Sequence, residues 1–413
     1  MTIRPLILAL CLLAGAAPGE AQSHDPSQSG SREGARQRIK TTLHVPAPLP
    51  ALAVERYGLF EPAPGVVAER VSYATDYGLR VPAIVYRPGR IPAGGMPGIV
   101  VVNGHGGDKY SWYAFYAGIL YAQAGAAVVT YDPIGEGERN WQRKDGTRQH
   151  DRNVDPPDMA RRMSGLMLTD VMQAVSYLAA RPDVDAKRLA AVGYSMGSFV
   201  LGIACAIETR LNSCVLAGGG NLDGPGGYWD SSSKRMCQAI PYQSLMFLGD
   251  RGAVLYDLHA ERGSTLVING TADDVVSIPN MGATFFDDLR QRTAALRGTD
   301  RNVFDVRWVR DGGHRPYFLT RPAALWLEQR LHFAQPVDRL GETHISEWAA
   351  RNNVYIDRQY ASELREGGTH ALGAGIPAVP HDDMNALPRE RWEQDKEKYV
   401  YESWLKAASA LAK

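Results

Sequence analysis

Gly193-Tyr194-Ser195-Met196-Gly197 is the stretch that decides the fold of this 413-residue chain. It has the pattern G-x-S-x-G, and it lies between an apolar run at residues 189–194 and an expected helix at residues 198–211. A serine at such a strand-to-helix junction lies on a sharp turn that raises its hydroxyl above the sheet. Side chains at the two glycines would obstruct this tight backbone path. The stretch therefore predicts a nucleophile elbow, with Ser195 as the nucleophile.

Seven further runs are predicted to be strands of the same sheet. Residues 66–77 and 79–87 are expected to form an antiparallel hairpin. The others are apolar runs without alternation, typical of parallel strands covered on both faces: residues 98–102, 126–131, 213–217, 265–269 and 303–309. Helices are expected between them, at residues 111–124, 159–180, 280–296 and 316–333. We therefore predict an α/β fold with a doubly wound, mostly parallel sheet of eight strands and an antiparallel N-terminal hairpin.

The composition excludes one broad class of function. The chain has 45 basic and 45 acidic residues, so its formal net charge is zero. No block of Lys and Arg gives it a basic arm or patch. We therefore expect no nucleic-acid partner.

The N-terminus has the features of a cleaved secretory signal. Arg4 precedes an apolar segment at residues 5–17, and Gly19-Glu20-Ala21 offers small residues for cleavage before Gln22. The apolar segment is too short to span a membrane comfortably. We expect residues 1–21 to be a signal peptide, the mature chain to have no membrane span, and the protein to be secreted or periplasmic.

The remaining chain is divided by composition. Residues 22–53 are polar and then Pro-rich, and we expect a disordered or extended lead-in. Residues 54–335 contain all the predicted strands and form the expected catalytic domain. Residues 336–413 are expected to be a helical extension packed on that domain, because they have too little apolar material for a core of their own. Its helices are predicted at residues 341–353 and 388–412, with an irregular Gly/Pro-rich segment at residues 367–380 between them.

Three cysteines remain after the signal peptide: Cys205, Cys214 and Cys237. An odd number permits at most one internal disulfide. Because Cys205 falls on the apolar helix after the elbow, Cys214 with Cys237 is the conceivable pair. Three buried free thiols are the equally open alternative.

Ser195 needs a base, and the base needs an acid. His314 is the one histidine among ten that comes directly after a predicted strand, in a Gly-rich turn before a helix. Asp273 follows the preceding strand at residues 265–269, and the order Ser, Asp, His is that of a nucleophile-elbow hydrolase. Asp274 and, more distantly, Asp223 are the alternatives for the acid. We predict that Ser195, Asp273 and His314 are catalytic.

An oxyanion hole should use two backbone N–H groups. One is that of Met196, directly after the nucleophile. The other is expected in the Gly-rich loop at residues 103–108, at Gly107 or alternatively Gly106. His105 in the same loop is expected to be structural rather than a base.

Aromatic residues near these loops are candidates for the substrate pocket, although core packing explains most aromatic clusters. They are Tyr110, Trp112, Tyr113, Tyr194, Tyr228 and Trp229. Residues 132–139 either form a Glu–Arg network beneath the site or an exposed charged turn.

Common metal and nucleotide motifs are absent from the sequence. There is no H-E-x-x-H, no paired C-x-x-C, no P-loop and no G-x-G-x-x-G after a first strand. We therefore expect neither a metal nor another cofactor.

Over roughly residues 54–333 the chain resembles the α/β-hydrolase superfamily. The resemblance rests on Gly193–Gly197, on Gly270-Thr271-Ala272-Asp273 and on Gly313-His314. The stretches at residues 104–109, 132–139 and 181–185 look like the bacterial acetyl xylan esterase-like and dienelactone hydrolase-like group. This resemblance implies a serine carboxyl-ester hydrolase without a cofactor, often acting on carbohydrate-linked acyl esters. Two features depart from the group: dienelactone hydrolases have a cysteine where this chain has Ser195, and the tail after Pro336 matches nothing in the superfamily core.

The predicted function is a secreted serine esterase acting on a small-molecule or polysaccharide-linked ester. A peptidase or amidase with the same three residues is the first alternative. Its prolyl-oligopeptidase-like branch would normally have a large N-terminal propeller, for which too few residues precede Val66. A noncatalytic binding protein on the same fold is a further alternative, although such proteins usually lose one of the three residues.

Overall fold

The structure is a computed structural model that describes residues 31–109, 111–153, 156–222, 227–231, 236–301, 303–337, 369–370, 379–380 and 385–412. The predicted signal peptide and the helix predicted at residues 341–353 lie outside the described residues. So does most of the segment at residues 367–380, of which β10 (Thr369–His370) and β11 (Val379–Pro380) form an antiparallel pair.

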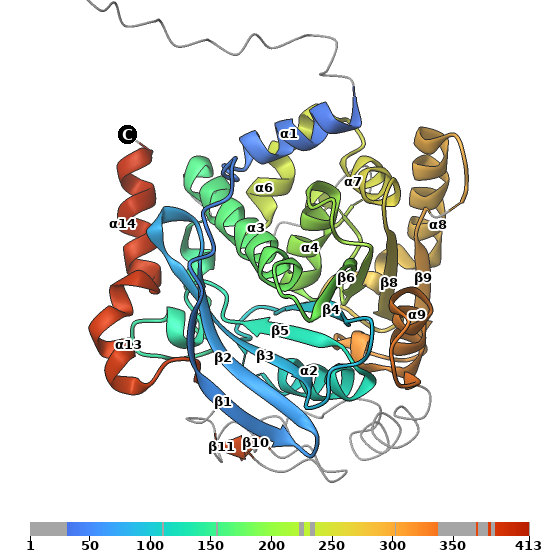
Figure 1. Cartoon of the computed structure of the whole chain (residues 1–413). Coiled ribbons are helices and arrows are strands. Elements are labelled where there is room, and N and C mark those ends of the chain that lie inside the picture. Colours follow the sequence, from blue (N-terminus) through green and yellow to red (C-terminus); the bar gives the residue numbers. More distant parts are fainter. Residues whose placement is uncertain are drawn as a thin grey trace, which may run out of the picture.

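One sheet organises the molecule (Figure 1). Its strand order is β1-β2-β3-β5-β4-β6-β7-β8-β9. The neighbours β1–β2, β2–β3 and β3–β5 pair in antiparallel fashion. All later neighbours in this order, from β5–β4 to β8–β9, are parallel. The bounds are β1 Glu55–Ala63, β2 Val66–Ala74, β3 Arg80–Pro88, β4 Met96–Val102, β5 Ala127–Tyr131, β6 Val184–Tyr194, β7 Ser213–Ala217, β8 Ser264–Gly270 and β9 Asp305–Val309. The mostly parallel α/β sheet with an antiparallel start is confirmed, and the eight predicted strands correspond to β2–β9.

The ninth strand, β1, is a correction to the predicted eight. It lies at the edge of the sheet, and polar and apolar residues are mixed along it because one side faces solvent. Its pairing with β2 shifts register between Arg56 and Gly58, and Gly58 has a φ of 124°. A bulged, half-exposed edge strand lacks the continuous apolar run of a buried strand.

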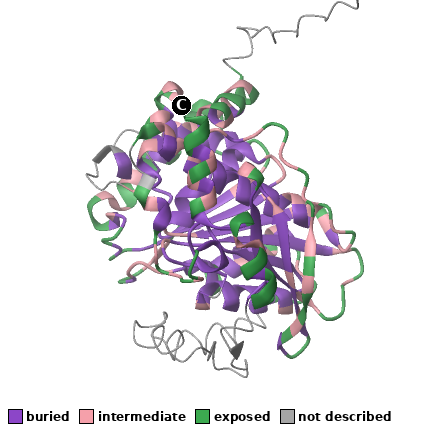
Figure 2. Cartoon of the chain, turned by 90° about the vertical axis from the view of Figure 1, so that its left-hand side faces the viewer, coloured by how far each residue is buried: buried purple, intermediate pink, exposed green. Residues whose placement is uncertain are grey.

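Helices cover both faces of the sheet. The helices are α1 Arg32–Thr42, α2 Trp112–Ala124, α3 Pro157–Ala179, α4 Met196–Ile207, α5 Tyr228–Ser231, α6 Ala239–Ser244, α7 Arg251–Ala260, α8 Ile278–Arg297, α9 Arg321–Leu331, α13 Arg389–Asp395 and α14 Tyr401–Leu411. Helices α2 and α9 share one core with one face, while α1, α3, α4, α7 and α8 share the other core (Figure 1). Buried residues accordingly fill the central strands and the helix surfaces that face them (Figure 2).

Helix α1 corrects the prediction of a disordered or extended lead-in at residues 22–53. Ser31 caps this helix by accepting a hydrogen bond from the Gly34 N–H at 3.0 Å. Arg36, only 2% exposed, donates to the carbonyls of Ala206 at 3.0 Å and Leu258 at 2.9 Å. Helix α1 buries only Arg36 and Ile39, so its polar composition concealed a helix that these two side chains anchor to the core.

The cysteine pairing is also a correction. The disulfide joins Cys205 to Cys214, and Cys237 is a buried free thiol. Cys205 lies in the last turn of α4 and Cys214 lies on β7, so the bond closes the short connection between these elements. The pair Cys214–Cys237 was wrong because the end of α4 returns close to the start of β7.

The helix predicted at residues 388–412 is present as two helices, α13 and α14. α13 and α14 follow one another after residue 388 and lie beside the antiparallel strands in Figure 1. Among the described helices, none is both long enough and apolar enough to cross a membrane.

Candidate active site

Ser195 occupies the turn between β6 and α4. Its φ of 54° and ψ of −120° are unusual for a residue with a side chain, and such strained turns are characteristic of functional sites. A Cβ atom on Gly193 would lie 2.6 Å from the Gly197 carbonyl oxygen, and one on Gly197 would lie 2.2 Å from that of Val102. The two glycines of the motif are therefore needed for this close backbone approach.

His314 reaches Ser195 from the loop after β9. Its Nε2 lies 2.7 Å from Ser195 Oγ, and its side chain is 13% exposed. The Tyr194 hydroxyl donates to the His314 carbonyl oxygen at 3.1 Å, and the two rings lie 5.0 Å apart. These contacts hold the imidazole against the elbow.

Asp273 completes the chain of contacts from the loop after β8. Its Oδ2 lies 2.8 Å from His314 Nδ1, and its Oδ1 accepts the Val275 N–H at 3.2 Å. Asp273 is fully buried, whereas the neighbouring Asp274 is exposed. The alternative acid Asp223 lies outside the described residues. The structure thus brings the three predicted residues together in hydrogen-bonding order.

The Gly-rich loop after β4 lies beside the nucleophile, since a Cβ atom on Gly104 would lie 3.2 Å from that of Ser195. Three of its amides are already engaged: Gly104 donates to the Tyr113 hydroxyl at 3.1 Å, Gly107 to the Gly104 carbonyl at 3.0 Å, and Asp108 to the Ser111 hydroxyl at 3.0 Å. Because the Gly107 amide already donates within the turn of the loop, Gly107 is disfavoured as the oxyanion donor that we predicted first. This leaves the amide of Gly106, our alternative, or that of His105.

A pocket of about 550 Å³ opens over Ser195 and His314. Its other lining residues are His105, Arg148, Tyr194, Met196, Phe199, Trp229, Met236, Gln238, Val275 and Val276. The lining combines aromatic and aliphatic side chains with a few polar groups, as ligand pockets usually do.

Of the predicted pocket residues, Tyr194 and Trp229 line this pocket. Tyr228 is buried behind it and stacks on Phe199, with ring centroids 5.7 Å apart. Tyr113 is also buried and holds the loop after β4, with Trp112 packed edge-on against it. Tyr110 lies outside the described residues.

Other lining residues were missed by the sequence analysis. Arg148, Met236 and Gln238 come from irregular segments around η3 (Gln149–Asn153) and α6, and no motif marks them. Phe199 lies four positions after Ser195, about one turn along α4. This spacing could have predicted that its side chain lies near the nucleophile.

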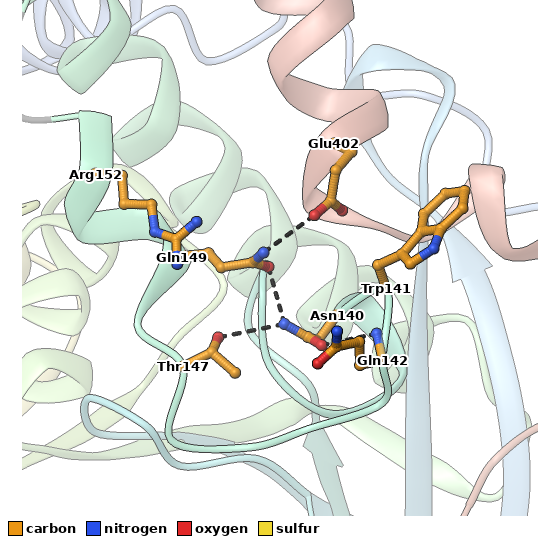
Figure 3. A pocket seen from close by; sticks show the side chains of 7 residues that line it. All are labelled: Asn140, Trp141, Gln142, Thr147, Gln149, Arg152 and Glu402. Carbon is orange, nitrogen blue, oxygen red and sulfur yellow. Dashed lines mark hydrogen bonds between the residues drawn. The ribbon is translucent and has the colours of Figure 1, made fainter.

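A second pocket, of about 520 Å³, lies between residues 140–152 and α14 (Figure 3). It is lined by Asn140, Trp141, Gln142, Thr147, Gln149, Arg152 and Glu402. Gln149 joins its two sides, accepting from Asn140 at 3.0 Å and donating to Glu402 at 3.1 Å (Figure 3). None of the described residues that line it is a histidine, serine or cysteine, the residue types that supply the nucleophile and base of the first pocket.

The segment at residues 132–139 is buried rather than an exposed turn. Lys109 pairs with Asp132 and, at 2.7 Å, with Glu138, and Arg139 pairs with Asp170. Burial alone would lower the pKa of Lys109, but the two carboxylates raise it above its usual value. Lys109 is the residue that follows the Gly-rich loop in the sequence, so its ion pairs join this charged network to the loop.

Residues 109–337 match the sequence profile of the prolyl oligopeptidase family, which is more than half of the chain. The chain belongs to the prolyl oligopeptidase family. This is a family of serine hydrolases in the α/β-hydrolase clan, so the predicted superfamily is confirmed. No curated protein matches the chain significantly.

Solved structures share the fold of this prolyl oligopeptidase family member at low sequence identity. A Bacteroides fragilis NCTC 9343 protein assigned as an acetyl xylan esterase has 14% identity and a TM-score of 0.51, covering 67% of this chain and 74% of its own. A glucuronoyl esterase from Solibacter usitatus has 15% identity and a TM-score of 0.50, covering 75% of this chain and 92% of its own. At such identities the likeness concerns the fold.

Proposed function

We propose that this protein is an exported serine esterase that hydrolyses short acyl esters through Ser195, His314 and Asp273. The observation that carries the proposal is the hydrogen-bonded order of the three side chains, 2.7 Å from Ser195 to His314 and 2.8 Å from His314 to Asp273. A serine hydroxyl becomes a nucleophile when an oriented base takes its proton. The alternative of a noncatalytic binding protein has no comparable observation in its favour.

The steps of the reaction follow from these contacts. The Asp273 carboxylate accepts the Nδ1–H of His314, which leaves the Nε2 lone pair to accept the Ser195 proton. Ser195 Oγ attacks the ester carbonyl carbon, and the imidazolium then protonates the leaving alcohol. Water, deprotonated by the same imidazole, hydrolyses the acyl-enzyme and restores Ser195.

Two backbone donors would stabilise the negative oxygen of the tetrahedral intermediate. The N–H of Met196 begins α4, where the helix N-terminus favours negative charge. The second donor is the amide of Gly106 or His105, because the Gly104 and Gly107 amides are already engaged.

The pocket supports a compact substrate. Trp229, Phe199 and Met236 supply apolar surface for a short acyl group, while Arg148 and Gln238 can bind polar groups of the alcohol. The two fold neighbours are named as an acetyl xylan esterase and a glucuronoyl esterase. Acetyl and glucuronoyl esters are therefore the substrates to test first.

Export is supported by the disulfide Cys205–Cys214. Disulfides persist in oxidising compartments and are rare in the cytosol. This bond agrees with the signal peptide predicted at residues 1–21.

The test is hydrolysis of p-nitrophenyl esters of increasing acyl length by the unaltered chain and by Ser195→Ala. We expect activity on short acyl chains, reduced about 10⁴-fold or more by the substitution. Ester hydrolysis that survives Ser195→Ala would sink the mechanism.

A matched pair of variants tests the acid. Asp273→Asn should lose about 10⁴-fold in kcat because His314 is no longer held in the required tautomer. Asp274→Asn alters an exposed neighbour and should behave like the unaltered chain. Equal losses in the two variants would contradict the role of Asp273.

A peptidase or amidase is the second candidate, and the family match favours it. Its reaction would use the same three residues. An aminoacyl p-nitroanilide cleaved faster than the matched p-nitrophenyl ester would establish this alternative over the esterase.

A further inference from the structure

Four side chains that can bind a metal meet in one wall of the active-site pocket. They are His105, His150, Asp151 and Cys237, and one ligand atom from each lies within 4.8 Å of all the others. They come from three segments: the Gly-rich loop after β4, η3, and the turn before α6. His105 itself lines the pocket, as do Arg148, Met236 and Gln238 on either side of the other members.

The spacing of these atoms suits a tetrahedral ion. Nε2 of His105 lies 3.1 Å from Asp151 Oδ1 and 3.5 Å from Cys237 Sγ. A tetrahedral zinc ion with bonds of about 2.0 Å to nitrogen and oxygen and about 2.3 Å to sulfur separates such ligand pairs by about 3.3 and 3.5 Å. Small adjustments would therefore bring the first three atoms onto one ion.

His150 presents the fourth ligand. Its Nδ1 lies 3.2 Å from the Ile134 carbonyl oxygen, so Nδ1 carries the proton and Nε2 has the lone pair. Nε2 is buried and has no hydrogen-bond partner among the described residues. A backbone carbonyl that fixes one ring nitrogen is the usual support for a histidine that binds metal through the other.

Asp151 is oriented in the same manner. Arg148 donates to its Oδ2 at 2.9 and 2.5 Å, and the backbone N–H of Cys237 donates to its Oδ1 at 3.0 Å. The carboxylate is thus held with Oδ1 toward His105. His105 and Asp151 thus have hydrogen-bond partners within the cluster, whereas His150 Nε2 has none in the part of the chain that the structure describes.

We propose that His105, His150, Asp151 and Cys237 form a binding site for a divalent transition metal, with Zn²⁺ as the ion that the two nitrogens, one oxygen and one sulfur suit best. Binding forms a metal–sulfur bond and releases the thiol proton of Cys237 to solvent. His105 binds the ion through the lone pair of Nε2 and keeps its ring proton on Nδ1, so Nε2 then contacts the ion instead of Asp151 Oδ1. The ion would join the Gly-rich loop to η3 and to the turn before α6.

A second cluster in the described part of the chain provides a contrast. Cys205, Cys214 and His259 also lie close together, but the two cysteines are bonded to each other. Their sulfurs therefore cannot act as thiolate ligands. His259 is a matched control for a buried histidine outside the proposed site.

The test is a titration of the full-length, chelator-treated protein with Co²⁺, which reports thiolate ligation through a charge-transfer band. We expect one equivalent to bind with this band, and Zn²⁺ to displace it. Cys237→Ala and His150→Ala should lose the band, while His259→Gln should keep it. Absence of the band in the unaltered chain, or its persistence in Cys237→Ala, would overturn the proposal.

X-ray absorption of the zinc-loaded, unaltered protein needs no variant to fold. A sulfur neighbour at about 2.3 Å, with nitrogen and oxygen at about 2.0 Å, is expected. A zinc shell without sulfur would reject the site. Neither measurement depends on hydrolysis, so the metal site and the esterase proposal can fail separately.

Discussion

His259 is a buried histidine that lies outside the candidate active site. It lies on α7, its Nδ1 is 2.6 Å from Thr265 Oγ1, and it is 3% exposed. Burial and the positive charge of Arg36 outweigh a backbone contact at Leu211 and lower its pKa from 6.5 to about 4. The folded protein therefore keeps this ring neutral at pH values where the unfolded chain protonates it.

The sign of the resulting pH dependence follows directly. Between pH 6.5 and 4 the unfolded state binds more protons, so the free energy of unfolding falls as the pH falls. The shift corresponds to about 3 kcal/mol from this residue by pH 4. His259→Gln should remove that part of the slope, as measured by urea unfolding from pH 7 to 4 with a chelator present.

A control separates this effect from general acid sensitivity. His332 is exposed, so His332→Gln should keep the full slope. The pKa of His150 is also lowered to about 4, chiefly by burial, so part of the slope should persist in His259→Gln. An unchanged slope in His259→Gln would contradict the prediction.

Single residues were predictable where each followed a strand at the same sheet edge. Ser195, Asp273 and His314 were placed in this way, and the structure brings them together. The prediction of Gly107 as an oxyanion donor failed because its amide donates to the Gly104 carbonyl. No sequence pattern indicates which loop amides form such internal hydrogen bonds. His150 and Cys237 were missed because the proposed metal ligands come from three segments without a motif.

At the scale of elements, the disulfide Cys205–Cys214 joins the end of α4 to β7. The cysteines are nine positions apart in the sequence. A crosslink that closes a loop of this length lowers the entropy of the unfolded chain by an amount worth about 2–3 kcal/mol. Replacing both cysteines with alanine should lower the free energy of unfolding by about that much.

The measurement is urea unfolding of the double variant and of the unaltered chain, each with and without reductant. Reductant should destabilise the unaltered chain and leave the double variant unchanged. Equal unfolding midpoints for the unaltered chain in both conditions would contradict a stabilising disulfide.

Elements were predictable from sequence where both of their faces are buried. Strands β4 and β7 are fully buried, and their apolar runs identified them. Strand β1 is half exposed at the edge, and helix α1 buries only Arg36 and Ile39, so neither has the expected apolar pattern. In both cases tertiary contacts override the local sequence signal.

At the scale of the whole molecule, the C-terminal segment is joined to the network beside the Gly-rich loop. The Glu138 carboxylate accepts the N–H groups of Ala386 at 2.8 Å and Leu387 at 2.9 Å. The same carboxylate pairs with Lys109, two residues after Gly107. Trp392 is 1% exposed and donates its Nε1–H to the Glu138 carbonyl at 2.8 Å.

These contacts distinguish a structural tail from one that only binds a polymeric substrate. Ending the chain at residue 384 would remove two donors from Glu138, and a buried carboxylate without its donors is strongly destabilising. Trp392→Ala should lower the free energy of unfolding by about 3–5 kcal/mol, the usual cost of truncating a buried aromatic. Leu411→Ala, at a position 63% exposed on α14, should change it little.

Activity provides the second half of this test, because the network at Glu138 lies next to the loop that would bind the oxyanion. The truncated chain should lose kcat on a small p-nitrophenyl ester, which has no polymer to bind, in parallel with its stability. If the tail served only to bind a polysaccharide, the truncated chain would keep its unfolding midpoint and its small-ester kinetics. Only its KM on polymeric substrate would then rise. Measuring both substrates with the truncated chain, Trp392→Ala and Leu411→Ala separates the two roles, and the buried contacts of Glu138 favour the first.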